Sequence, residues 1–361
     1  MEKRIKRNRP TIGVLAGWQT YPGTIHSFLD HVFRGIQSAA RDFDCNLLIG
    51  CAVNSPFQQH SNQVMPIPLP GADFIPVGPW NTDGMVIAGP LFNEPADQYF
   101  QGLIDAGFPI VYAGDRETAP SVIVDNEGGI QQAIDHLVEH GHRRIAYIAG
   151  YNASHGDSAA RWRGYRTGLA KHGLTYDPDI VEIGEHLPGI SYQAMRKILE
   201  KGKPFSAVIA SNDESAMGAI EALRDFGLIV PNDVAVVGFD DRLEARAQIP
   251  LLTSIHHPMF ELGYQSFELV FKIISGEAPQ HSLVRIPTHL VIRESCGCLP
   301  GKQTVVENLT YQNDHFAIQT QYPYTHGSFL TVPFPEFTSA GLNLEKIAPE
   351  ISSEMAGWVH C

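Results

Sequence analysis

The sequence predicts an α/β protein built on parallel sheets, and three observations in one stretch lead to that prediction. The run SAVIA (206–210) is apolar and bounded by polar residues, which is typical of a strand buried on both faces. Residues 214–226 then place apolar side chains at helical spacing, and Gly227 ends that helix. VAVVGF (234–239) is a second buried strand, so the stretch forms a right-handed βαβ unit.

Length and composition describe a globular protein. The 361 residues suffice for two lobes that each bury a core, and 43% hydrophobic and 18% charged residues are ordinary proportions. The net charge of −13 argues against the body of the protein gripping a phosphate backbone. No apolar run approaches the ~18 residues of a membrane span. The basic start MEKRIKRNRP is a poor signal peptide, and the five cysteines are an odd number, so we expect a cytoplasmic chain without a membrane partner.

The other elements follow in chain order. TIGVLA (11–16) is the first buried strand, a helix covers about 25–43, and CNLLIG (45–50) is the next strand. Residues 52–79 carry six prolines and predict a long surface loop rather than a helix. Residues 82–90 form a strand, 98–106 a helix, and 108–117 a strand and its end. Residues 259–274 form a helix ended by Gly276, and a last strand lies within 281–298.

Polar side chains follow both strands of the βαβ unit. Asn212 and Asp213 come after the first strand, and Asp240 and Asp241 come after the second. The crevice beyond the carboxyl ends of parallel strands is where such sheets bind ligands. The alternative is that Asp213 caps the following helix and Asp241 lies in a solvated turn. Asn212 and Asp240 are therefore the residues that we expect to bind a hydroxylated ligand.

The same stretch resembles a known family. Ala-Ser-Asn-Asp (210–213), Ala-x-Gly-Ala (216–219), Val-Pro-Asn-Asp-Val (230–234) and Val-Gly-Phe-Asp-Asp (237–241) resemble the effector-binding domain of LacI/GalR-type transcription regulators, as does Ile-Pro-Thr-x-Leu-Val-x-Arg-Glu-Ser (286–295). The resemblance runs from about 11 to 298, and only the proline-rich insert departs from it. It implies two Rossmann-like lobes with parallel sheets flanked by helices, similar to type I periplasmic binding proteins and joined by three crossovers.

The resemblance also implies domain limits. Asp125-Asn126-Glu127 resembles the first crossing between lobes. The N-terminal lobe is then 11–124 with 257–278, and the C-terminal lobe is 125–255 with 280–298. Residues 1–10 are a basic tail, and 299–361 are an extension that is either a poorly ordered end or a linker toward an output domain. Because the family's helix-turn-helix and hinge precede this point, we expect DNA contact only through a missing or separate domain.

Four further binding residues are predicted, of which the resemblance favours Phe28, Asp115 and Arg161, while Arg116 is predicted from its place at the end of a strand. An aromatic matching Phe28 stacks on the ligand ring in the family, although Phe28 could equally be a core residue. Asp115 and Arg116 stand at the end of a strand, where they could hold a diol between them or form a surface ion pair. Arg161 matches the family's ligand-gripping arginine, and its alternative is an exposed helix position. Arg163 and Arg166 are expected to be exposed.

Metal and catalytic motifs find little support in the pattern. His136 and His140 stand at i, i+4 on a helix without a carboxylate to complete a motif, and His142 follows. Cys296-Gly-Cys298 is one pair that lacks the second half of a zinc site. No nucleophile elbow, phosphate loop or dinucleotide fingerprint occurs. The sequence therefore predicts no metal, no cofactor and no enzyme activity.

These observations together predict a sensor. A small polar effector, a sugar or nucleoside-like molecule, is held between the lobes and favours their closure, in a chain that we expect to form a homodimer. Two alternatives keep the fold and change the output: the input module of a histidine kinase or diguanylate cyclase, or a sugar-transport binding protein. An enzyme on this fold is a more distant alternative.

Overall fold

The computed structural model describes residues 9–16, 28–51, 53–54, 63–64, 67–68, 75–88, 94–116, 119–151, 156–279 and 281–298. Most of the basic tail, the extension 299–361 and the side chain of Phe28 lie outside the described residues. Among the described helices, none combines the length and the apolar character that crossing a bilayer requires.

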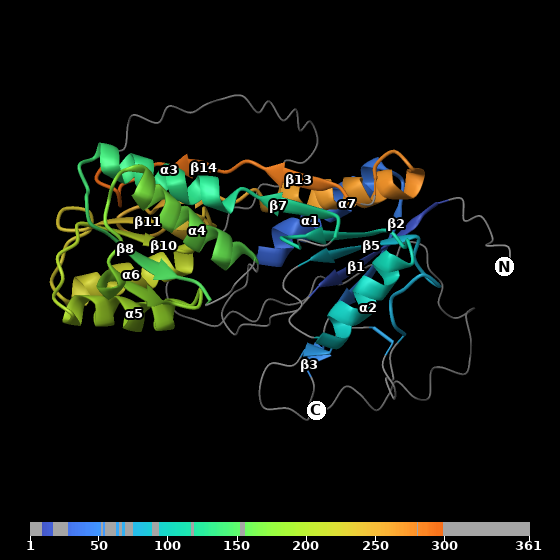
Figure 1. Ribbon diagram of the computed structural model, residues 1–361, viewed down its shortest axis with the longest axis horizontal. Helices are drawn as coiled ribbons and strands as arrows, with labels where there is room; N and C mark the ends of the chain where they lie inside the picture. Colours follow the sequence, from blue (N-terminus) through green and yellow to red (C-terminus); the bar gives the residue numbers. More distant parts are fainter. Residues whose placement is uncertain are drawn as a thin grey trace, which may run out of the picture. The chain divides into compact units, whose positions relative to one another are not determined.

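The first lobe is a six-stranded parallel sheet in the order β13-β7-β6-β5-β1-β2 (Figure 1). Helices α1 (Phe28–Asp42) and α7 (Met259–Ser275) cover one face, and α2 (Glu94–Asp105) covers the other. The strands are β1 (Thr11–Ala16), β2 (Asn46–Cys51), β5 (Gly84–Ala88), β6 (Ile110–Ala113), β7 (Ser121–Val124) and β13 (Leu283–Ile286).

Two glycines allow α1 and α7 to pack with their backbones in contact. A Cβ on Gly35 would stand 2.0 Å from the Phe260 carbonyl oxygen, and one on Gly263 would stand 2.0 Å from the Val32 carbonyl oxygen. No side chain fits at either distance, so these positions require glycine.

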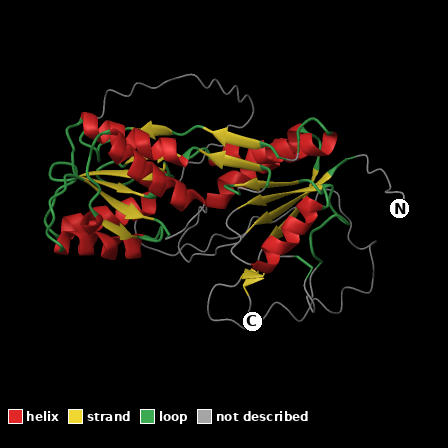
Figure 2. Ribbon diagram, in the orientation of Figure 1, coloured by secondary structure: helices red, strands yellow, loops and turns green. Residues whose placement is uncertain are grey.

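The second lobe is also a sheet with helices on its faces (Figure 2). It has six strands in the order β14-β12-β11-β10-β8-β9, and only β14 is antiparallel to its neighbour. Helices α3 (Asn126–Glu139) and α4 (Gly156–Lys171) cover one face, and α5 (Pro188–Glu200) and α6 (Asp213–Asp225) cover the other. The strands are β8 (Ile145–Ala149), β9 (Val181–Ile183), β10 (Ala207–Ala210), β11 (Ala235–Asp240), β12 (Thr253–His256) and β14 (His289–Val291).

The chain passes between the sheets three times, as predicted. It leaves the first sheet after β7, returns to it after β12 and leaves it again between β13 and β14. The expectation that residues 280–298 belong wholly to the C-terminal lobe is wrong. Strand β13 pairs with β7 in the first sheet because its register continues the parallel ladder from Leu283 to Ile286. The third crossover therefore lies at Pro287 and Thr288.

The proline-rich insert is more than a surface loop. It contains the short antiparallel pair β3 (Val53–Asn54) and β4 (Gln63–Val64). Ile67 and Val77 are 1% and 3% exposed and pack in the first lobe's core beside α2. These two apolar residues, each next to a proline, therefore pack the insert against the first lobe.

Candidate functional site

A network of polar side chains lies beyond the carboxyl ends of β8, β10 and β11 in the second lobe. Its members come from the start of α3, from the first two turns of α4, from the ends of β10 and β11 and from the loop between β9 and α5. Parallel strands place their carboxyl ends at one edge of a sheet, and this is the edge at which we expected a ligand.

Arg161 is the centre of this network. Only 4% of its surface is exposed, because it lies on the buried face of α4. Its Nε donates to Asn126 Oδ1 at 2.7 Å, and its Nη1 donates to the Ser211 carbonyl at 2.6 Å. Its Nη2 lies 3.3 Å from Asp240 Oδ1, and the guanidinium carbon stands 3.7 Å from the centre of the Phe239 ring. Four groups from three segments, the start of α3, the end of β10 and the end of β11, thus hold one buried charge in a fixed orientation.

The backbone explains how Arg161 reaches that position. Gly164 lies one turn further along α4, where a Cβ would come within 2.9 Å of the Glu127 carbonyl oxygen. Helices α3 and α4 therefore approach closely, and this brings Arg161 to Asn126 at the start of α3. The alternative considered for Arg161, an exposed position on the helix surface, is excluded by its burial.

Asp240 ends β11 in a strained conformation. Its φ is +109°, and Asp241 follows with a φ of +53°, a region that residues other than glycine rarely adopt. Burial raises the pKa of Asp240 to about 6, while the guanidinium of Arg161 acts in the opposite direction. The carboxylate is thus ionised at neutral pH, and 13% of its side chain stays exposed to accept further hydrogen bonds.

His186 joins the network from the loop after β9. Its Nε2 lies 2.8 Å from Ser158 Oγ, and its Nδ1 lies 3.3 Å from Ser211 Oγ. Burial first, and then the positive charge of Arg161, lower the pKa of His186 to about 4, so the ring is neutral near pH 7. The Tyr151 ring meets it edge to face at 5.3 Å and is itself 43% exposed.

Asn212 is engaged within the protein on both sides of its amide. Its Oδ1 accepts from the Ser215 backbone N–H at 2.9 Å, which makes Asn212 the N-cap of α6. Its Nδ2 donates to the His186 carbonyl at 3.3 Å. The amide has a second hydrogen, so it can still donate one bond to a ligand.

The alternative roles considered for Asp213 and Asp241 are wrong. The helix cap is Asn212, and Asp213 is fully buried, accepting from Ser254 Oγ at 2.5 Å and from the Arg242 backbone N–H at 2.8 Å. Desolvation raises the pKa of Asp213 well above its usual value. The side chain of Asp241 is 3% exposed and bonds Arg293. Both carboxylates thus form hydrogen bonds within the protein that hold the ends of the neighbouring strands in place beside the site.

The first-lobe candidates stand apart from this network. Arg116 Nη2 pairs with Asp97 Oδ1 at 3.2 Å and does not pair with Asp115. Asp115 is half-buried and has no hydrogen bond or ion pair with any described residue. Of the six predicted binding residues, the structure joins Arg161 to Asp240 directly and links Asn212 to them through Ser211 and His186. The other three remain predictions.

The sequence interpretation missed five members of the network: Asn126, Tyr151, Ser158, His186 and Ser211. A signal existed for Tyr151, because Gly150-Tyr151 directly follows β8, and the rule used for Asn212 and Asp240 also applies there. The sequence interpretation used Asn126 only to mark the first crossing of the chain between the lobes. His186 follows a strand of three residues, which is too short to recognise by pattern.

The comparisons with known proteins agree with this architecture. A periplasmic binding protein-like domain model matches residues 134–296. The chain is 36% identical over 223 residues to the HTH-type transcriptional regulator CelR of Thermobifida fusca. The aligned residues are 60% of this chain and 64% of CelR, so the chain spans just under two thirds of the length of that relative. It is 28% identical over 306 residues to the HTH-type transcriptional repressor MelR of Bacillus subtilis, covering 83% of each chain.

Solved structures show the same fold. The structure of a transcriptional regulator CelR–cellobiose complex superposes with a TM-score of 0.65 at 28% identity, covering 80% of this chain and 85% of that chain. A regulatory protein of the LacI family from Chloroflexus aggregans gives a TM-score of 0.65 at 26% identity, covering 78% of this chain and 98% of that one. The two-lobed arrangement is thus shared with proteins that regulate transcription.

Proposed function

We propose that this chain, which carries the effector-binding domain of a LacI/GalR-type transcription regulator, senses a small hydroxylated molecule such as a sugar or a nucleoside. The observation that carries the proposal is the buried Arg161, held between Asn126, Ser211 and Asp240 beside a neutral His186. The effector would reach this network from the open side of the strand ends and would bond to Arg161 and Asp240.

The chemistry of the network suits hydroxyl groups. A hydroxyl both donates and accepts, so an acceptor carboxylate next to a donor guanidinium can hold one or two of them. Tyr151 offers an exposed ring on which the C–H face of a sugar can pack. Every bonded polar group of the network is oriented by another protein group, which suits reversible binding better than bond making. The named relatives, which are transcriptional regulators, support binding as the function.

Signalling would then follow from closure of the lobes. Asp115, which lacks a partner among the described residues, and Phe28 are the first-lobe side chains proposed to meet the effector. A ligand that touches both lobes shifts their equilibrium only by its differential affinity for the closed state, typically ~1–3 kcal/mol. We propose that a homodimer passes this shift to DNA-binding domains that are not part of residues 11–298.

The experiment is a binding screen on the purified chain. Thermal shift across monosaccharides, disaccharides including cellobiose, and nucleosides should show at least one class that raises the melting temperature, and isothermal titration should confirm it. Arg161→Ala should lose about tenfold or more in affinity for that hit, which corresponds to a charge-assisted hydrogen bond of ~1.5–3 kcal/mol.

Arg163→Ala is the matched control on the same helix. Its side chain is 49% exposed and pairs with Glu127 at 2.7 Å, outside the network. It should bind the hit as the parent does. Tyr151→Ala, a change at an exposed side chain, guards against misfolding of the Arg161 variant. If both Arg161→Ala and Tyr151→Ala bind the hit with unchanged affinity, the site is wrongly assigned.

A further inference from the structure

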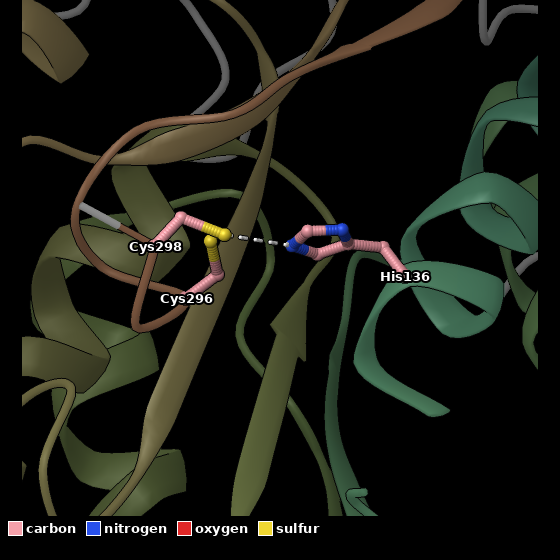
Figure 3. Close-up of side chains that lie close together, drawn as sticks. All are labelled: His136, Cys296 and Cys298. Atoms are coloured by element: carbon pink, nitrogen blue, oxygen red, sulfur yellow. Dashed lines mark hydrogen bonds between the residues drawn. The ribbon is translucent and has the colours of Figure 1, made fainter. Parts of the chain in front are cut away.

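Two pairs of metal-binding side chains meet at the other end of helix α3. His136 lies in its last turn and His140 is its C-cap, while Cys296 and Cys298 lie in the turns after β14. Figure 3 shows the two sulfurs next to each other and facing the ring of His136. One ligand atom from each of His136, Cys296 and Cys298 lies within 4.8 Å of the other two.

The fourth side chain reaches the same sulfur. Cys298 Sγ lies 3.7 Å from His136 Nε2 and 3.5 Å from His140 Nε2, and the two imidazole rings stand side by side with centres 4.5 Å apart. A thiol carries one hydrogen and can donate it to only one of these rings. The other ring can contact the sulfur only as a donor to a weak acceptor, whereas an ion shared with the sulfur would engage both rings strongly.

The distances fit a tetrahedral ion. With Zn–S bonds of about 2.3 Å and Zn–N bonds of about 2.0–2.1 Å, tetrahedral angles separate sulfur from nitrogen by about 3.5–3.6 Å. The observed separations of 3.5 and 3.7 Å match two edges of that tetrahedron, those between Cys298 and the two rings. His140 lies outside the group of three whose ligand atoms are all within 4.8 Å of one another, so its exposed side chain would complete the shell by turning toward Cys296. Two thiolates and two imidazoles are a ligand set that zinc prefers.

The surroundings also fit a bound ion. Cys296 is 2% exposed and His136 is 8% exposed, so half of the cluster is protected from water, while His140 is exposed and leaves a path for entry. Thr253 Oγ1 donates to Cys296 Sγ at 3.2 Å, which stabilises negative charge on that sulfur. The remaining described thiol, Cys45, is buried in the first lobe's core among apolar residues.

We propose that His136, His140, Cys296 and Cys298 form a structural zinc site of the His₂Cys₂ type. Four protein ligands leave no open coordination position, so the ion would bind no substrate. It would join the last described segment of the chain, residues 294–298, to helix α3. The spacing is His-x₃-His on one helix and Cys-x-Cys more than 150 residues later. In the sequence alone each half is incomplete, because the His pair has no carboxylate to complete a motif and the Cys pair lacks the second half of a zinc site.

The test uses the full chain without a polyhistidine tag, purified with a phosphine reductant so that the thiols stay reduced. Elemental analysis should find about one zinc ion per chain. Replacing zinc by Co²⁺ should give the intense visible bands and thiolate charge transfer of a tetrahedral cobalt–thiolate site. A zinc chelator should lower the melting temperature by about 5 °C, because the ion binds only the folded state.

Four variants separate this site from adventitious binding. Cys298→Ser should lose the zinc, the cobalt spectrum and the chelator effect. His140→Asn, at an exposed position that should not impair folding, should weaken zinc binding at least tenfold. The controls are Cys45→Ser in the first lobe and His289→Asn, which is an exposed position on β14 in the second lobe, where the proposed zinc site lies. Both variants should keep the zinc.

Two results would overturn the proposal. One is a reduced, folded parent chain that holds no stoichiometric zinc and whose melting temperature does not respond to zinc or chelator. The other is Cys298→Ser and His140→Asn retaining as much zinc as the two controls. Neither result bears on effector binding, which is measured at the opposite end of α3.

Discussion

The two ends of helix α3 present polar clusters of opposite character. At its first residue, Asn126 accepts from Arg161 at 2.7 Å and donates to Asp157 at 2.9 Å. At its last turn and C-cap, His136 and His140 stand 3.7 and 3.5 Å from one sulfur. The helix has 14 residues, so the clusters are about 20 Å apart.

The distances between polar atoms distinguish a pre-organised binding site from an ion site. Around Arg161, the groups meet at hydrogen-bond distances, so the protein itself satisfies the buried charge. Around Cys298, the two ring nitrogens stand at the sulfur–nitrogen separations of a coordination shell, and hydrogen bonds between a thiol and an imidazole are weak. The first cluster should therefore be sensitive to loss of its own members, and the second to loss of an ion.

The largest expected effect is on stability at the first cluster. Arg161→Ala should lower the free energy of unfolding by about 3–5 kcal/mol, because it leaves Asp240 as a buried charge without its partner. Arg163→Ala, with its exposed partner, should cost less than about 1 kcal/mol. Urea denaturation measures both.

The double variant Arg161→Met with Asp240→Asn tests the stated cause. Removing both charges should recover most of the lost free energy, since no uncompensated charge then remains. If the double variant is as unstable as Arg161→Ala, packing at the position rather than the unpaired carboxylate is responsible.

The second effect is a pair of opposite pH dependences within the first cluster. The pKa of Asp240 is raised from 3.8 to about 6, so the folded state binds the extra proton and this group adds stability as the pH falls through 6 toward 4. The pKa of His186 is lowered from 6.5 to about 4, so the unfolded state binds that proton first and stability is lost as the pH falls from 6.5 to 4. In the parent the two contributions oppose each other.

Single variants should separate these contributions. Relative to the parent, Asp240→Asn should lose stability between pH 6.5 and 4, and His186→Gln should gain it, each by about 2–3 kcal/mol for a shift of about two pKa units. Thermal unfolding in a series of buffers measures both differences. Two variants whose stability changes with pH in the same direction would show that one of these pKa shifts has the wrong sign.

The sequence pattern was sufficient for the parallel α/β units because the strands of parallel sheets are apolar on both faces, while the two lobes and their three crossovers came from the family resemblance. β1 occupies Thr11–Ala16 as predicted, and the ends of β10 and β11 put Asn212 and Asp240 on the expected edge. Arg161 was found through a family motif, since nothing in the local pattern distinguishes it from Arg163 two residues later. Its burial depends on the close packing of α3 and α4, which only the folded chain shows.

The rest depended on contacts between distant residues. Whether Leu283–Ile286 belongs to the first or the second sheet is decided by pairing with β7, more than 150 residues earlier, and no local signal shows it. The same holds for His136 and Cys298, which are separated by 162 residues. A helical His pair and a Cys-x-Cys pair are each weak as isolated motifs. They become a candidate ion site only when the fold places them together.

The smallest expected effect concerns communication between the two ends of α3. Sites more than about 10 Å apart that share no partner usually contribute to stability additively, within about 0.5 kcal/mol. Asn126→Ala and Cys298→Ser, combined in one chain, should therefore change the free energy of unfolding by the sum of their separate effects. Cys298→Ser should also bind the effector within about twofold of the parent, a factor of two being about 0.4 kcal/mol. A coupling well above 1 kcal/mol would mean instead that α3 responds as one unit, so that occupancy of the ion site would tune effector binding.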